Sequence, residues 1–415
     1  MHILFLTDNF YPEVNAPASR TYEHCKEWVR QGVEVTVVTC VPNFPQGKVY
    51  KGYKNKLYQV EYIDDIKVIR VWSYISANQG FTKRILDYVS FMVSAVCVSP
   101  FVGKPNIIIG TSPQFFTVCA AYLISKIKRV PFIFELRDLW PESIKAVGVL
   151  NDSFIIRFFE KLELSLYRRA IKIISVTNSF KRVLIERGIS GEKIDVITNG
   201  VDLTRFKKAL PNENIIQRYG LKGKFVAGYV GTHGAAHSLE TLIRAAAILQ
   251  ETKGGEDIDI VLLGDGSEKI KLVQQANKMN LTNLHFIDTV PKSEVARYWS
   301  ILNVSIIHLK KTDLFKTVIP SKLFECMGMG IPILHGVSGE SAEIVVKEGA
   351  GVVFESENPM DLVEKLISLK KDSELYGQYK SSSYRAAQNY DRTKLASKML
   401  SLIEQTVQCK TTALE

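Results

Sequence analysis

The sequence predicts an α/β protein built from two doubly wound parallel sheets, and three observations lead to this fold class. At 415 residues the chain is too long for one ordinary core and fits two domains of roughly 200 residues each. A strand–loop–helix–strand order opens the chain between Ile3 and Thr39, and the same order restarts at Phe225. The balance of 46% hydrophobic and 23% charged residues is typical of a globular protein.

The first half opens with a strand from Ile3 to Thr7, a loop that contains Pro12 and Pro17, and a helix from about Ser19 to Gln31. Its other expected strands are Glu34–Thr39, Val68–Val71, Ile107–Gly110, Phe132–Glu135, Ile171–Val176 and Ile194–Ile197, with helices between them. Such an alternation predicts a parallel sheet, because a parallel neighbour needs a crossover connection.

The second half repeats the alternation after the stretch from Pro211 to Gly223, which we expect to be the linker between the domains. Its expected strands are Phe225–Val230, Ile258–Leu263, Leu284–Phe286, Val304–Ile307 and Ile331–Leu334, with helices at Leu239–Gln250, 267–279 and 293–301. We therefore expect a first domain over residues 1–205 and a second over 206–390. A final segment, 391–415, is expected to cross back to the first domain as a helix and then fray.

Charge is distributed unevenly along the chain. Residues 1–200 hold 26 Lys and Arg against 18 Asp and Glu, a balance of +8, whereas the remainder holds 27 against 25, a balance of +2; together they give the formal +10. A basic first half indicates an anionic partner, which could be a phospholipid surface, a lipid-linked pyrophosphate or nucleic acid. A scattered, solvated basic surface is the alternative.

The segment from Tyr88 to Val102 is almost uncharged, but it is shorter than the roughly 20 apolar residues that span a bilayer. Lys83 and Arg84 precede it and Lys104 follows it. We expect a buried helix of the first domain, with a surface that rests on a membrane as the alternative. No signal peptide precedes the first strand, and the six cysteines lack metal-type spacing, so a cytosolic protein with free thiols is expected.

The run from Ile319 to Leu334 carries the most functional information. Pro320 suits the first turn of a helix, and a helix start presents free amides and a partial positive charge to phosphate. Lys322 adds a cation there, and Glu325 follows on the same face, about where a ribose diol would lie beside the phosphate. A helix that stops at Gly328 and Gly330, before the strand that Pro332 opens, completes the pattern of a nucleotide-sugar site.

Other segments lie at the expected carboxyl ends of strands, where open α/β sheets bind ligands. Gly231-Thr232-His233-Gly234-Ala235-Ala236-His237 links a strand to a helix but lacks the G-x-G-x-x-G spacing of dinucleotide sites. His233 and His237 have no third ligand in view, so no metal is expected. Gly264-Asp265-Gly266 and Asn199-Gly200 are also explained as ordinary turns. Glu135 to Ser143 combines acids, Arg137 and Trp140 after a buried strand, which favours a functional loop.

These segments together resemble glycosyltransferase family 4, whose retaining members have the GT-B fold of two Rossmann-like domains facing a central cleft. The resemblance covers nearly the whole chain and rests on Gly32 to Thr39, Asn199-Gly200-Val201-Asp202, Gly264-Asp265-Gly266 and Pro320-Ser321-Lys322 with Glu325. Asp138 to Ser143 and Gly231 to Gly234 resemble a branch that builds bacterial O-antigen and capsule, including fucosamine (N-acetyl-L-fucosaminyl) transferases.

The chain departs from the family pattern at several positions. Of the family's Glu-x7-Glu pair only Glu325 remains, because Thr317 occupies the first position. The family's diphosphate-binding arginine and lysine fall on Thr232 and His237, and the histidine often found before its aspartate is Arg137. The glycine pair of the first loop is replaced around Asn15 and Ala16. We infer from these departures that Lys322 and Arg137 supply the cationic charge.

The resemblance implies transfer of a sugar from a UDP-sugar donor to a polyprenyl-diphosphate-linked saccharide, with retention, at the inner face of the cell membrane. It implies no metal or other cofactor and no nucleic-acid partner. The implied catalytic residues are Lys322, Arg137 and Asp138, and the implied acceptor-side residues are Trp140 and Glu142. The implied donor-binding residues are Asn15, Ala16, Thr232, His233, Gly264, Val290, Thr317, Pro320, Ser321, Lys322, Leu323 and Glu325.

Rival functions differ in the residues they need. A dinucleotide-dependent oxidoreductase requires a glycine fingerprint and a ribose-binding acid, and neither is present. A two-lobed sugar-binding protein would normally carry a signal peptide. A GT-B nucleotide-sugar epimerase of the UDP-GlcNAc 2-epimerase type stays open, because Asp138 and Glu142 could act as its acid and base.

Overall fold

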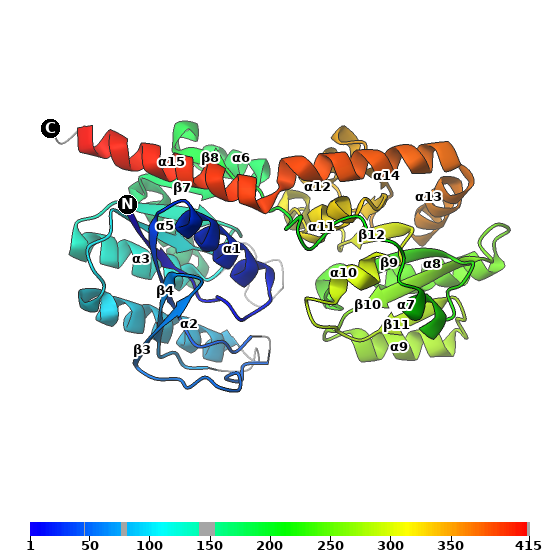
Figure 1. The fold of residues 1–415 in the computed structure, drawn as a ribbon, viewed down its shortest axis with the longest axis horizontal. Coiled ribbons are helices and arrows are strands. Elements are labelled where there is room, and N and C mark those ends of the chain that lie inside the picture. Colours follow the sequence, from blue (N-terminus) through cyan, green and yellow to red (C-terminus); the bar gives the residue numbers. More distant parts are fainter. Residues whose placement is uncertain (45, 76–80, 141–153, 413–415) are drawn as a thin grey trace. The chain divides into compact units, whose positions relative to one another are not determined.

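The computed structural model describes residues 1–44, 46–75, 81–140 and 154–412, and it divides into two compact units. The first unit contains Met1–Thr198 together with the chain from Arg392 onward, and the second contains Asn199–Asp391. Each unit is an α/β domain with its own sheet (Figure 1). The two Rossmann-like sheets predicted from the sequence are therefore confirmed.

The first unit is organised around an eight-stranded sheet in the order β3-β4-β2-β1-β5-β6-β7-β8. Its strands are β1 (His2–Leu6), β2 (Glu34–Thr39), β3 (Tyr58–Ile63), β4 (Ile66–Val71), β5 (Ile107–Thr111), β6 (Phe132–Leu136), β7 (Lys172–Ser175) and β8 (Ile194–Val196). Its helices are α1 (Ala16–Arg30), α2 (Phe81–Val98), α3 (Phe115–Lys128), α5 (Phe154–Arg169), α6 (Asn178–Glu186) and α15 (Arg392–Thr412). β1, β5 and β6 are buried along nearly their whole length. Strands of a parallel sheet that is covered on both faces have continuous apolar sequences, as these three do.

One strand of this sheet was not predicted. β3 pairs antiparallel with β4, and the two are joined by a tight turn in which Asp64 and Asp65 both have positive φ. β3 lies at the sheet edge and alternates exposed with half-buried residues, so it lacks the apolar run that identifies the central strands. Its sequence, Tyr-Gln-Val-Glu-Tyr-Ile, is the alternating pattern of such an edge.

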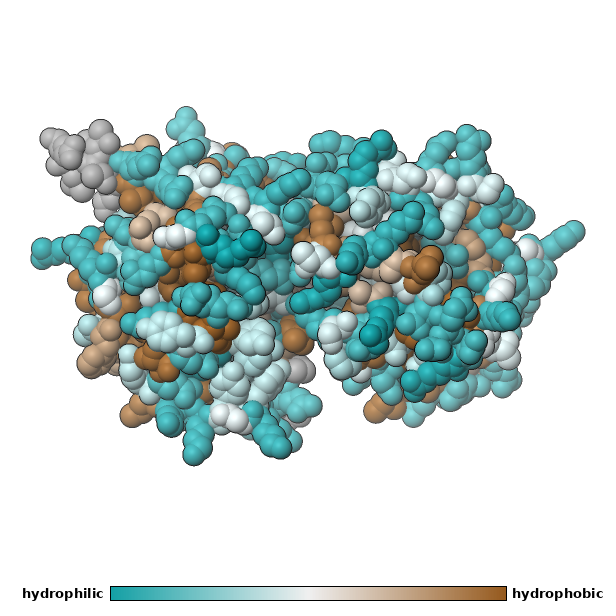
Figure 2. All heavy atoms as spheres, viewed as in Figure 1, coloured by the Kyte–Doolittle hydropathy of each residue, from teal (hydrophilic) through white to brown (hydrophobic). Residues whose placement is uncertain are grey.

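Helices cover both faces of the first sheet. α1 and α15 pack together on one face, where Trp28 is fully buried and its Nε1 donates to the carbonyl of Ala396 at 2.8 Å. α2, α3 and α5 form the core of the other face. α2 is only partly buried, since Phe91 and Ala95 are inside and Leu86 and Val93 are about half exposed. In Figure 2, apolar side chains are visible on the part of this unit where Figure 1 shows α2 and α3.

The second unit has a six-stranded, fully parallel sheet in the order β11-β10-β9-β12-β13-β14. Its strands are β9 (Phe225–Val230), β10 (Ile258–Leu263), β11 (Leu284–Ile287), β12 (Val304–His308), β13 (Ile333–Gly336) and β14 (Gly351–Val353). Its helices are α7 (Glu213–Arg218), α8 (Glu240–Glu251), α9 (Lys269–Lys278), α10 (Val295–Trp299), α11 (Lys322–Met329), α12 (Glu340–Lys347), α13 (Pro359–Lys371) and α14 (Ser373–Ala387). The stretch from Pro211 to Gly223, read as a linker, contains α7 and is part of this unit.

Candidate functional site

The second unit concentrates polar residues at the carboxyl ends of β9 and β10. The loop after β9 runs from Gly231 to His237, and it is tied to the β10 loop because the His233 amide donates to the Asp265 carbonyl at 2.8 Å. Gly264 allows this approach: it has φ +144°, and a Cβ there would lie 1.9 Å from the Gly231 carbonyl oxygen. The glycines predicted from the sequence therefore let two backbone loops meet.

Lys322, the first residue of α11, reaches under this loop. Its Nζ is buried and, within the described residues, has no hydrogen-bond partner. The amine lies 3.6 Å from the centroid of the Tyr229 ring, a cation–π contact. A Cβ on Gly231 would come within 2.6 Å of the same amine, so glycine at that position leaves room for it. Burial lowers the pKa of Lys322 to about 7, although Glu325 and Cys326 act to raise it.

Histidines surround this lysine without adding charge. Burial is the main cause that lowers the pKa of His233 to about 4 and that of His237 to about 3, and nearby Lys322 contributes to both. Both ring nitrogens of His233 and Nδ1 of His237 are buried without a partner among the residues described. His308 Nε2 accepts from the Glu357 amide at 2.9 Å, so its Nδ1 donates to the His237 carbonyl at 2.8 Å. The start of α11 and the loop after β9 thus bring a lysine and neutral imidazoles together, a set that suits an anion.

The start of α11 offers fewer amides than the sequence suggested. Pro320 and Ser321 already belong to the turn, because the amides of Leu323 and Phe324 donate to their carbonyls at 3.0 and 3.1 Å. An anion at this helix start would therefore meet the amides of Ser321 and Lys322. The Leu323 side chain is fully buried in the core and its amide is used, so the structure leaves this predicted donor-binding residue no exposed group of its own.

Several other predicted donor-binding residues belong to the second unit as well. Glu325 follows Lys322 by one turn of α11 and acts electrostatically on it. Thr317 Oγ1 donates to the Leu314 carbonyl at 2.7 Å, and half-buried Val290 packs against the core. Thr232 is exposed, and its carbonyl accepts from the Tyr229 hydroxyl at 2.9 Å. Tyr229 was missed from the sequence; the signal was a phenol in an otherwise apolar strand.

In the first unit, Arg137 and Asp138 follow β6. The amides of both donate to Ser112 Oγ, at 2.8 and 3.3 Å, which fixes the strand end. Arg137 Nη1 donates to the Pro17 carbonyl at 3.3 Å, while its buried Nε has no partner in the described part of the chain. Burial lowers the pKa of Arg137 to about 10, against the opposing effect of Glu135. Its guanidinium stays charged at neutral pH.

Two residues predicted for the acceptor side have different outcomes. Trp140 is 7% exposed and belongs to the core, where its ring stacks on Phe115 with centroids 4.5 Å apart. This packing favours a structural role, because little of the indole is left for a ligand. Glu142 lies outside the described residues. Asn15 and Ala16, which the resemblance implies to be donor-binding, lie in the first unit: Asn15 caps α1 by accepting from the Ala18 amide at 2.8 Å, and Ala16 is the exposed first residue of that helix.

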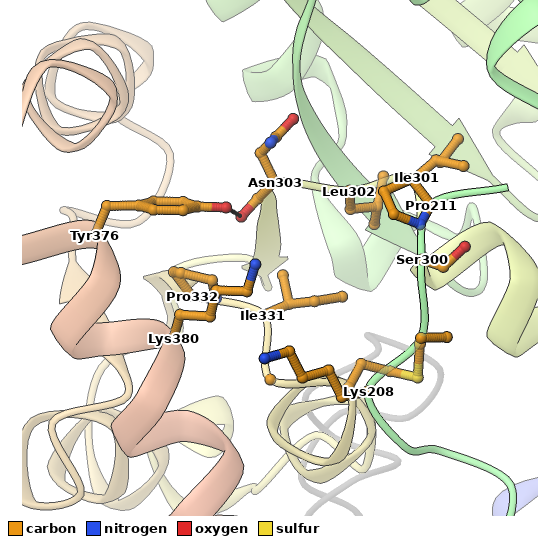
Figure 3. A pocket seen from close by; sticks show the side chains of 13 residues that line it. Lys208, Pro211, Ser300, Ile301, Leu302, Asn303, Ile331, Pro332, Tyr376 and Lys380 are labelled. Atoms are coloured by element: carbon orange, nitrogen blue, oxygen red, sulfur yellow. Dashed lines mark hydrogen bonds between the residues drawn. The ribbon is translucent and has the colours of Figure 1, made fainter. Parts of the chain in front are cut away.

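A hollow in the second unit lies at the amino ends of two of its strands. It is bounded by Asn303, just before β12, and by Ile331 and Pro332, just before β13. Figure 3 shows Lys208 and Lys380 extending toward it, and the Tyr376 hydroxyl donates to the Asn303 carbonyl at 3.1 Å. Because it lies at the amino ends of the strands, it is separate from the Lys322 site. No group of three or more metal-binding side chains occurs within the described ranges.

The buried lysine predicts a pH-dependent stability difference between the native chain and Lys322→Met. Below about pH 7 the lysine is charged in both folded and unfolded chains, so Lys322→Met should be the more stable protein. Between about pH 7 and the ordinary lysine pKa, only the folded lysine loses its proton, so native stability rises with pH and the gap narrows. Denaturant unfolding across this range measures the gap. A gap independent of pH would contradict the assigned burial.

Comparisons with known proteins identify both units. Residues 18–205 match the model described as Glycosyltransferase Family 4, and residues 211–386 match Glycosyl transferases group 1. WcaI of Escherichia coli (strain K12), named as a colanic acid biosynthesis glycosyl transferase, is 25% identical over 340 residues, covering 80% of this chain and 82% of that protein. TuaH of Bacillus subtilis (strain 168), named for teichuronic acid biosynthesis, is 24% identical over 58% of this chain and 59% of its own length.

Solved structures agree on the fold. Alr3699/HepE of Anabaena, crystallised in complex with UDP, superposes with a TM-score of 0.71 at 16% identity, over 98% of this chain and 100% of that chain. The two sheets, the order of their strands and the two family matches, one to each unit, lead to the same assignment. The protein belongs to the family 4 glycosyltransferases and has their GT-B fold.

Proposed function

We propose that this protein transfers a sugar from a UDP-sugar to a lipid-linked saccharide during the synthesis of a bacterial surface polysaccharide such as O-antigen or capsule. The observation that carries the proposal is the buried, unpartnered amine of Lys322 beside the glycine loop and the start of α11. A diphosphate would supply the counter-charge that this amine lacks. The names of WcaI and TuaH support a polysaccharide pathway, and the HepE complex supports UDP as the nucleotide.

In the proposed reaction the acceptor attacks the front face of the donor sugar and the configuration at that carbon is retained. The departing phosphate takes the acceptor's proton, so no protein base is needed. Lys322 stabilises the charge that grows on the diphosphate, and Glu325 accepts hydrogen bonds from the ribose. Arg137 of the first unit is proposed to add positive charge, and Asp138 of the same unit is proposed as a further catalytic residue. No metal cofactor is required when a lysine provides the charge.

The donor sugar is proposed to be an N-acetylated or deoxy hexose such as N-acetyl-L-fucosamine, because the sequences of Asp138 to Ser143 and of Gly231 to Gly234 resemble that branch. Both matched family models describe glycosyltransferases, which does not favour the epimerase alternative. Mass spectrometry of a polyprenyl-diphosphate-linked acceptor incubated with a panel of UDP-sugars tests the proposal. It should show one added sugar, unaffected by EDTA. A UDP-sugar converted to its C2 epimer with no acceptor product would overturn it.

Lys322 and Glu325 should affect different steps. Lys322→Ala should lower turnover on the order of 100-fold with a smaller loss of UDP affinity, because the charge matters most as the phosphate departs.

Glu325→Gln should weaken UDP binding by about 2 kcal/mol in calorimetry, the value of a charge-assisted hydrogen bond. The matched controls are Lys278→Ala and Glu364→Gln, which remove exposed charges of the same kind. Native turnover in Lys322→Ala would exclude the proposed role.

A surface of the first unit supports docking on the cytoplasmic face of the membrane. In the described ranges, no helix is both long and apolar enough to cross a bilayer. However, α2 packs against α3, and α3 against α5, and each of the three exposes large apolar side chains. These are Leu86, Val93, Leu123, Ile127, Phe154 and Phe158, with Phe101 just beyond α2. Exposed basic residues lie among them at Lys83, Lys104, Lys126 and Arg157. Apolar groups interleaved with cations suit an anionic lipid surface.

Vesicle binding tests this surface. The native chain should sediment with phosphatidylglycerol vesicles at low salt and be released at high salt, because each exposed cation contributes about 1 kcal/mol that salt screens. Lys83→Glu with Lys126→Glu should weaken binding strongly. Lys394→Glu with Lys398→Glu, the same charge change on α15, should not. Equal recovery with neutral and anionic vesicles, or none with either, would rule out electrostatic docking.

A further inference from the structure

The first unit contains a cavity of about 210 Å³ at the carboxyl edge of its own sheet. Residues from the loop after β1, the loop after β2 and the start of α2 line it. These include Asp8 and Asn15, Asn43 and Phe44, and Asp87 and Tyr88 respectively. The volume is below the roughly 300–1,000 Å³ of pockets for drug-sized ligands, which favours a ligand of a single ring.

Two carboxyl groups from distant parts of the chain converge in this cavity. Burial raises the pKa of Asp8 to about 8, and nearby Asp87 and Glu13 raise it further. Burial also raises the pKa of Asp87 to about 7, while Arg84 lowers it. The pair therefore holds on the order of one proton at neutral pH, so it can donate one hydrogen bond and accept several. This combination suits hydroxyl groups, which both donate and accept.

The two carboxyls are held differently. Asn9 Nδ2 donates to Asp8 Oδ2 at 3.2 Å, and Asn15 Nδ2 donates to Asn9 Oδ1 at 2.5 Å, so a hydrogen-bonded chain starting at the α1 cap fixes Asp8. The Asp87 carboxylate makes no hydrogen bond to any residue the structure describes. Asp8 is thus positioned by the protein, and Asp87 is left available to a ligand.

The remaining lining argues against an acidic ligand. Glu13 adds a third acid next to this cavity, although its Oε1 accepts from the amides of Asn43 and Phe44 at 2.8 Å. Arg84, the cation of the lining, is exposed, and its Nη2 donates to the Tyr88 hydroxyl at 3.2 Å. A further carboxylate placed beside Asp8 and Asp87 would meet like charge in a partly dehydrated site. Phe44 and Tyr88 provide apolar surface for the C–H face of a ring.

We propose that this cavity binds one uncharged sugar ring of the acceptor, with ring hydroxyls hydrogen-bonded to Asp87 and Asp8, and that it disfavours uronic acids. This proposal rests on the proposed function, because that function requires an acceptor saccharide and the first unit is proposed to bind it. It names the class of acceptor sugar that the chemistry of the lining accepts. Asp87 is the specificity-determining residue in this assignment.

Saturation-transfer NMR on the full chain tests the proposal with methyl glucoside and methyl galactoside, each paired with its uronate. With the native protein, the neutral glycosides should show a saturation-transfer signal. The signal of the uronates should be about tenfold weaker. Asp87→Asn should lose about tenfold in affinity for the neutral glycosides. Asp65→Asn, which removes an exposed carboxylate of the same unit, is the matched control and should behave as native. UDP calorimetry on every variant should give native affinity.

The possible failures are distinguishable. If UDP binds but no neutral glycoside is saturated, or if uronates bind equally well, the cavity assignment is overturned and the proposed transferase function stands. If Asp87→Asn binds the glycosides as the native chain does, Asp87 is not the specificity-determining residue. If neither UDP nor any other nucleoside diphosphate binds the native chain, the proposed function fails independently of the cavity.

Discussion

The proposed donor site of this protein depends on keeping one lysine amine inside a folded unit without a hydrogen-bond partner among the described residues. A buried cation is costly unless something compensates it, and here the compensation is partial: the Tyr229 ring, the field of Glu325 and a lowered pKa. Gly231 and Gly264 are required because side chains there would occupy the space of the amine or the facing backbone. An incompletely compensated charge is a site prepared for an anion, and a diphosphate fits that requirement.

The first unit depends on a different buried charge. Arg20 of α1 pairs with Glu135 at the end of β6, Nε to Oε1 at 3.0 Å, and both side chains are almost fully buried. The same guanidinium donates to the carbonyls of Ile197 and Thr198, the last residues of the unit before the chain leaves it. Arg392, where the chain re-enters, pairs with Glu23 of the same helix. α1 therefore holds both connections, and losing one partner of such a pair typically costs about 3–5 kcal/mol.

The two units share one fold, but the Lys322 site of the second unit and the cavity of the first unit differ in chemistry. The second unit places a lysine and neutral imidazoles in its site, whereas the first places carboxyl and amide groups around its cavity. An anionic diphosphate and an uncharged sugar ring are the ligands that suit these two surfaces. In this chain Thr232 and His237 stand where the resemblance places cations, so the charge at the proposed donor site comes from α11 and not from the β9 loop. We propose that Lys322, from its interior position, does the work of both of these cations.

The sequence by itself determined the fold class, the central strands, the glycine loops and the importance of α11, because these depend on local periodicity and on turn residues close together in the chain. It did not reveal β3, whose edge pattern resembles a loop, nor that Trp140 fills the core beside Phe115. It also gave no sign that Asp8 and Asp87 share a cavity or that the Lys322 amine lies over Tyr229. Those relations join residues from separate elements, and burial, pKa and contact between them arise only when the sheet brings the strand ends together.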